Sequence, residues 1–113
     1  MTAGDRVSQE VKVLVANAAE DYVGLWQLVK RAFRVLGSAD EAEIMVTSMA
    51  ITRDLLSHGL VVGELTESGG FSAWKDQAPD AVVRRIEAEW KTLGRPPNIG
   101  DVCWFHRHTG HVK

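Results

Sequence analysis

The chain has 113 residues, of which 45% are hydrophobic and 25% are charged, so its length and composition are those of one globular domain. The net charge of -2 provides no general attraction for nucleic acid, and no run of about 18 apolar residues predicts a membrane-spanning helix. One cysteine excludes an internal disulfide, and the first residues lack the apolar run of a signal peptide, so we expect a cytoplasmic protein.

Two helices are predicted in the first third of the chain. We expect residues 1–7 to be disordered, and Ser8 is a suitable N-cap for a first helix. A second, amphipathic helix is predicted over 21–36, with Gly37 ending it. Its expected core-facing residues recur at three- and four-residue steps and are Tyr22, Leu25, Val29, Ala32 and Leu36, with Trp26 and Phe33 beside them.

A third helix is predicted from Ser38 to about His58. The stretch 38–41 has the residue types of a capping box, with Ser38 as the N-cap. Two neighbouring rows recur along this helix at helical spacing: one consists of Ile44, Ser48, Ile51 and Leu55, and the other of Met45, Met49, Thr52 and Leu56. Gly59 then ends the helix.

The second half of the chain predicts a hairpin, a helix and a strand. Residues 60–65 and 71–74 flank a turn at 67–70, which is typical of a β-hairpin. A last helix is predicted over 79–93, in which Trp90, like Trp26 earlier, is expected in the core. A strand over 99–105 is expected to pair with 60–65, and 106–113 to form a flexible polar tail.

These elements predict an α+β fold in a single domain over 8–105. The helices are expected to pack on a three-stranded antiparallel sheet, in a winged-helix-like arrangement. In the segment 53–61 a helix ends directly in a hairpin. This feature favours sequence-specific DNA binding, because many winged-helix regulators have their recognition helix at this position. The acidic residues at the start of the third helix and in the hairpin oppose it, because they repel phosphates. A winged-helix DNA-binding transcriptional regulator is therefore one of two hypotheses.

The C-terminal end of the chain contains residue types that can bind a metal or act as a catalytic nucleophile. Cys103, His106, His108 and His111 are possible zinc ligands, but their spacing matches no zinc motif, so no metal and no cofactor is expected. Cys103 could be a nucleophile with His106 as its base. Because its neighbours Val102 and Trp104 are apolar, we expect a buried, unreactive thiol and no enzyme activity.

Three segments resemble parts of small bacterial proteins of unassigned function. They are Glu20–Trp26, Glu87–Gly94 and Pro97–Phe105. In size and compartment the chain also resembles immunity proteins of contact-dependent growth inhibition and polymorphic toxin systems. The resemblance implies a small cytosolic protein that blocks a toxin by binding it.

The leading hypothesis is therefore a protein-binding inhibitor of a basic toxin domain, with a nuclease as the expected class. An acidic surface can occupy the groove in which a nuclease holds its substrate. The predicted partner-binding residues are Asp40, Glu41, Glu43, Glu64, Glu67 and Trp74. We expect the five acids on one side of the domain, with the hairpin folded back along the third helix. One of Trp74 and Trp104 is expected to be an exposed anchor.

Overall fold

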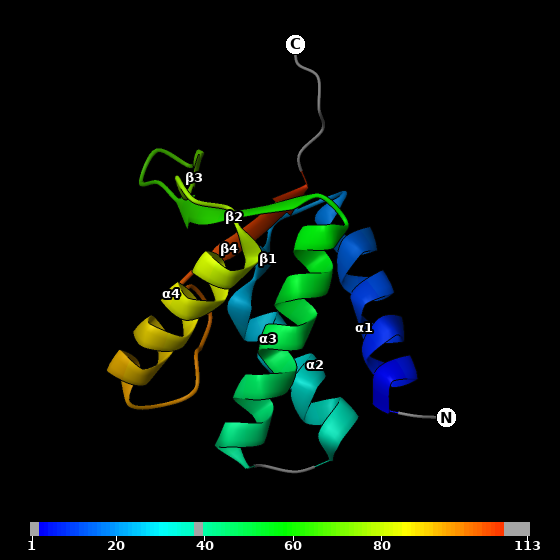
Figure 1. Ribbon diagram of the computed structural model, residues 1–113. Coiled ribbons are helices and arrows are strands. Elements are labelled where there is room, and N and C mark those ends of the chain that lie inside the picture. Colours follow the sequence, from blue (N-terminus) through cyan, green and yellow to red (C-terminus); the bar gives the residue numbers. More distant parts are fainter. Residues whose placement is uncertain (1–2, 38–39, 108–113) are drawn as a thin grey trace.

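The computed structural model describes residues 3–37 and 40–107 (Figure 1). The described elements are α1 (Ala3–Ala18), β1 (Val23–Gly24), α2 (Leu25–Leu36), α3 (Glu41–Ser57), β2 (Leu60–Leu65), β3 (Phe71–Ala73), α4 (Pro79–Leu93) and β4 (Trp104–Arg107). The predicted α+β class is confirmed. None of the described helices has both the length and the apolar character that crossing a membrane requires.

Within the described residues, the sheet has four strands in the order β1-β4-β2-β3, and all its pairs are antiparallel. The predicted pairing of the last strand with 60–65 is confirmed, since Val62 lies opposite Phe105. The predicted number of three strands is wrong, because Val23 and Gly24 pair with Phe105 and Trp104. The last of the described strands, β4, therefore lies in the middle of the sheet.

The second helix was predicted to include residues 21–24, but α2 begins only at Leu25. The Gly24 N–H donates to Gln27 Oε1 at 2.7 Å, and the Leu25 N–H donates to the Cys103 carbonyl at 3.1 Å. These hydrogen bonds satisfy backbone N–H groups at the start of α2, which have no acceptor within the helix. The reason for the late start is the pairing of β1 with β4, which a local helical pattern cannot reveal.

The ordered region extends beyond the predicted bounds 8–105 at both ends. Residues 3–7 were expected to be disordered, but α1 begins at Ala3. Arg6 Nη1 donates to the Val35 carbonyl at 3.2 Å, and Val7 packs against the core, so α2 holds the first turn of α1 in place. At the other end, His106 and Arg107 belong to β4 and not to a tail. The remainder of the predicted tail, 108–113, lies outside the described residues.

The third helix begins later than predicted. Residue Asp40 is the N-cap, and its carboxylate accepts from the Glu43 N–H at 3.1 Å. Ser38, the predicted cap, lies outside the described residues. The acids Glu41 and Glu43 occupy the first turn, where they interact favourably with the positive end of the helix dipole.

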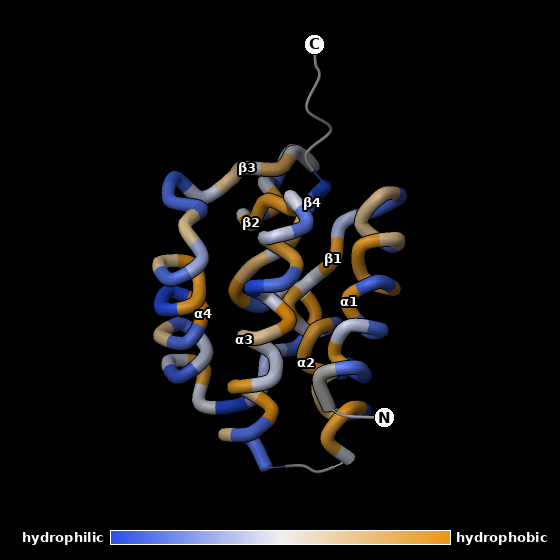
Figure 2. Tube along the Cα trace, turned by 45° about the vertical axis from the view of Figure 1, so that its right-hand side comes forward, coloured by the Kyte–Doolittle hydropathy of each residue, from blue (hydrophilic) through white to orange (hydrophobic). Residues whose placement is uncertain are grey.

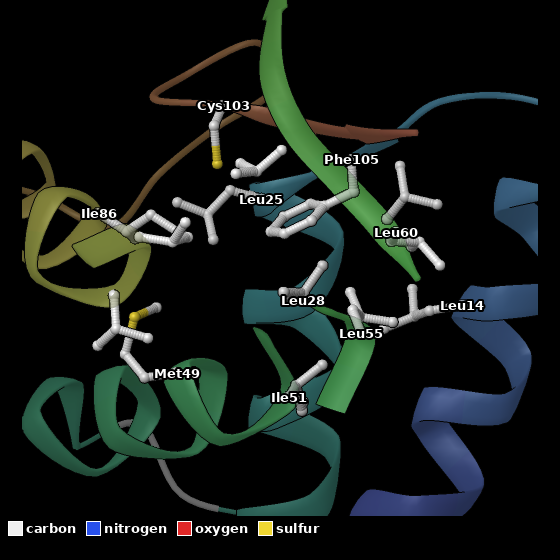
Figure 3. Packing of buried hydrophobic residues seen from close by; sticks show 14 of the residues in the cluster. Leu14, Leu25, Leu28, Met49, Ile51, Leu55, Leu60, Ile86, Cys103 and Phe105 are labelled. Atoms are coloured by element: carbon white, nitrogen blue, oxygen red, sulfur yellow. The ribbon is translucent and has the colours of Figure 1, made fainter. Parts of the chain in front are cut away.

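All four helices lie on the same side of the sheet (Figures 1 and 2), and the hydrophobic segments face inward between the layers (Figure 2). The core joins residues of every helix to Val23, Leu60, Val62 and Phe105 from the strands. The ring of Phe105 points to the centre of this core, toward residues of α2 (Figure 3).

The predicted rows of α3 are largely buried, whereas the predicted stripe of α2 is only partly so. The row at Ile44, Ser48, Ile51 and Leu55 is buried, and of the neighbouring row Met49 and Thr52 are buried and Met45 and Leu56 half-buried. The buried residues of α2 are Leu25, Leu28, Ala32 and Val35. Trp90 is 1% exposed, which confirms its core position, whereas Phe33 is 48% exposed and Trp26 is half-buried beneath the Lys30 ammonium. The buried face of α2 is thus rotated from the predicted stripe, because its contacts with α1 and α3 decide which side is covered.

Candidate interaction surface

The side of the sheet that carries no helix is rich in aromatic residues. Side chains alternate between the two faces of a strand, and Val23 and Phe105 point into the core. Their neighbours Tyr22, Trp104 and His106 therefore point away from the helices. Together with Phe71 of β3 they form what we term the aromatic face, defined as Tyr22, Phe71, Trp104 and His106, and all four are half-buried.

Three rings of the aromatic face are in mutual contact. The Tyr22 and Phe71 rings are stacked, with centroids 5.7 Å apart and planes 13° apart. The His106 ring lies 4.9 Å from Tyr22 and 5.3 Å from Phe71. The three side chains come from segments that are distant in sequence, so only the assembled sheet brings them together.

Two glycines leave room for these rings. Gly24 and Gly63 are the neighbours of Trp104 across β1 and β2. A Cβ at Gly24 would lie 2.7 Å from Trp26 Cδ1 and 3.2 Å from Trp104 Cζ3. A Cβ at Gly63 would lie 2.8 Å from Phe71 Cζ and would collide with a backbone carbonyl of β3. The aromatic rings thus lie directly against the strand backbone.

An acidic hollow borders the aromatic face where α1 ends and β1 begins. Its volume is about 200 Å³, and it is lined by Ala18, Ala19, Glu20, Asp21, Tyr22 and His106. Glu20 and Asp21 are exposed, and the last turn of α1 contains no basic residue. His106 Nδ1 is buried without a hydrogen-bond partner in the described part of the chain. The hollow therefore combines negative charge with aromatic walls.

The acids predicted to form one surface lie at two ends of the molecule. Asp40, Glu41 and Glu43 are at the start of α3, whereas Glu64 and Glu67 are in the β2–β3 hairpin. Figure 1 shows the start of α3 at the opposite end of the domain from the hairpin. The expected single acidic surface is wrong, because β2 crosses the end of α3 and does not return along it.

Several of the predicted partner-binding residues connect elements within the domain. Glu41 Oε2 accepts from Trp90 Nε1 at 3.0 Å, which joins α3 to α4. Glu64 Oε2 accepts from Trp74 Nε1 at 3.3 Å and from Arg85 at 3.2 Å.

Trp74 is 6% exposed, and the Arg85 guanidinium carbon lies 3.8 Å from its ring centroid. Trp74 is therefore not an exposed anchor, because α4 covers it. Trp104, the other candidate for that role, belongs to the half-buried aromatic face. All five acids are exposed, although Glu41 and Glu64 also bond to side chains of α4 and Trp74.

Cys103 and His106 cannot act together as nucleophile and base. The Cys103 side chain is 1% exposed and points into the core (Figure 3), whereas His106 lies on the aromatic face. Burial raises the pKa of the Cys103 thiol far above its ordinary value, which makes it unreactive. Within residues 3–37 and 40–107, no three His, Cys, Asp or Glu side chains are grouped to hold a metal, and His108 and His111 lie outside the described residues.

The sequence prediction missed the aromatic face apart from Trp104. A signal was present in the alternation of Trp104 and His106 with the apolar Cys103 and Phe105 in a predicted strand. Tyr22 carried no such signal, because the pattern around it is helical. No protein-family model, curated protein or solved structure matches the chain.

Proposed function

We propose that this domain is a protein-binding inhibitor, an immunity protein that neutralises a cognate nuclease toxin by binding it directly. The observation that carries this proposal is the aromatic face bordered by the carboxylates of Glu20 and Asp21. Aromatic side chains are enriched in the centres of protein interfaces, where they supply much of the binding energy. A half-buried cluster of rings on a rigid sheet is already ordered before a partner arrives, so little conformational entropy is lost on binding.

The charge next to the aromatic face favours a basic partner. Glu20 and Asp21 are exposed, and the C-terminal end of α1 adds the negative end of its dipole. Nuclease domains carry basic residues where they hold RNA or DNA. An acidic surface of this kind accelerates the encounter with a basic protein and can occupy its substrate groove.

The second candidate function is DNA binding by the α2–α3 helix pair. The observation in its favour is that α3 leads through Gly59 directly into the β2–β3 hairpin, in the order of elements found in winged-helix domains. The first turn of α3 carries Glu41 and Glu43, and the hairpin carries Glu64 and Glu67. Carboxylates at either place would repel the phosphates of a DNA duplex that approached it, so a protein partner is favoured.

The test of the proposed function begins with the reading frame directly upstream of the one for this chain, from which any nuclease-like domain is purified. Purified domain is mixed with the nuclease, and complex formation is measured by calorimetry while nuclease activity is followed on a fluorescent substrate. We expect a stoichiometric complex and loss of activity at equimolar inhibitor. Association should slow as salt rises from low to about 0.5 M, because screening weakens steering.

Two variants with the same change in charge separate the two acidic regions. Glu20→Gln with Asp21→Asn should slow association, whereas Glu43→Gln with Glu67→Gln should leave it unchanged. If no neighbouring toxin is bound or inhibited, the proposal is wrong. Selection of one sequence from a library of random DNA duplexes would establish the second candidate in its place.

A further inference from the structure

The acidic hollow has two sources of negative charge that belong to different elements. One is the pair of carboxylates of Glu20 and Asp21, both exposed. The other is the end of α1, where the N–H groups of these two residues return to the Asn17 carbonyl while no basic side chain lies in the last turn. A helix C-terminus carries roughly half a negative charge, so both sources favour a cation in the same place.

The walls of the hollow are aromatic rings suited to a planar cation. Tyr22 and His106 both line the hollow, with ring centroids 4.9 Å apart and planes inclined at 43°. Phe71, which does not line the hollow, contacts both rings: it is stacked on Tyr22 at 5.7 Å and tilted by 43° against His106 at 5.3 Å. A cation within about 6 Å of a ring centroid is attracted by the face of the ring. A guanidinium group also stacks flat on such a face and forms paired bonds to a carboxylate, which an ammonium group cannot do.

Within residues 3–37 and 40–107, neither Glu20 nor Asp21 forms an ion pair. Arg107 follows His106 in β4 and is exposed, and it forms no ion pair with any residue of the described chain. Lys30 lies 5.3 Å from the ring centroid of Trp26, on a helix that does not line the hollow. In the described part of the chain, the carboxylates of Glu20 and Asp21 thus have no cationic side-chain partner.

We propose that this hollow binds the guanidinium group of an arginine side chain presented by the partner protein. The guanidinium lies against Tyr22 and His106 and pairs with Glu20 and Asp21. The identity of the partner as a basic toxin rests on the proposed function, but the preference for arginine follows from the hollow alone. The arginine side chain thereby docks the partner on the aromatic face next to it.

The experiment uses the folded chain and a single-arginine probe, N-acetyl-glycyl-arginyl-glycinamide. Amide chemical shifts of the ¹⁵N-labelled protein are followed during titration with this peptide and with its lysine and citrulline counterparts. We expect saturable shifts centred on residues 19–22 and 106 with the arginine peptide. The lysine peptide should bind about 5-fold more weakly, and the uncharged citrulline peptide about 10-fold or more.

Variants then assign the binding to particular side chains. Tyr22→Leu should weaken the arginine peptide about 5-fold, and Glu20→Gln with Asp21→Asn about 3- to 10-fold. Glu43→Gln with Glu67→Gln makes the same change in charge elsewhere and should leave the affinity as in the wild type. Equal binding of the citrulline peptide, shifts centred on another surface, or no shifts at all would overturn the proposal.

The peptide titration needs no toxin, so its outcome is separate from that of the proposed function. A toxin complex without arginine binding in the hollow would overturn this inference and leave the inhibitor function intact. Arginine binding without any toxin complex would establish the hollow as an arginine-binding site and would show that the arginine does not come from a toxin.

Discussion

Replacing Gly63 by alanine tests how closely the aromatic face lies against the sheet. The new Cβ would lie 2.8 Å from Phe71 Cζ and 2.8 Å from Ala73 Cα, and closer still to the Ser72 carbonyl oxygen. Favourable carbon–carbon contacts are about 3.5–4.0 Å, so both carbon contacts are too short by roughly 0.7–1.2 Å. The atoms of Ser72 and Ala73 are backbone, so β3 itself must move. Such overpacking costs about 1–3 kcal/mol, and the lower entropy of the unfolded alanine chain offsets about 0.4–1 kcal/mol of it.

We therefore expect Gly63→Ala to lower the free energy of unfolding by about 1–2 kcal/mol, measured by urea denaturation followed by tryptophan fluorescence. Gly70→Ala is the matched control in the same hairpin. Its Cβ meets only Thr66 Oγ1, at 3.3 Å, and Gly70 is not among the residues with positive φ. This control should stay within about 0.5 kcal/mol of the wild type. Equal stability of the two variants would refute the close approach of β3 to Gly63.

Three further predictions concern single groups. Asp40→Ala should lower the free energy of unfolding by about 0.5–2 kcal/mol, because the cap to the Glu43 N–H is lost; an unchanged urea midpoint would show that this cap is not formed. Cys103 should resist a thiol-specific colorimetric reagent at neutral pH until urea is added, and rapid reaction of the folded protein would contradict its burial. The Arg95 guanidinium, 2.7 Å from the Asp101 carboxylate, lowers the pKa of Asp101 from its ordinary 3.8. The ion pair contributes fully to stability above pH 3.8, and this contribution is lost as the pH falls through the lowered pKa of Asp101. The melting temperature of Asp101→Asn should therefore decrease less steeply with falling pH than that of the wild type. An equally steep decrease would contradict the pairing.

The elements that sequence alone predicted correctly are those whose signals are local. Pro79 and Gly94 bound α4, and Gly37 adopts the left-handed conformation, with φ of 64°, that ends α2. The buried row of α3 recurs at helical spacing, and the alternation of 60–65 around a short turn predicts the β2–β3 hairpin. In each case the residues that determine the structure are within a few positions of one another.

The tertiary structure decided what depends on partners distant in the chain. Residues 22–24 continue a helical pattern, yet Val23 and Gly24 form a strand because Phe105 and Trp104 offer hydrogen-bonding partners from the other end of the chain. The direction in which β2 leaves α3 separated acids that the sequence placed on one surface. The contact of Tyr22 with His106 exists only because β1 pairs with β4. A local pattern shows which residues can be buried or paired, but the assembled sheet determines which faces remain open to a partner.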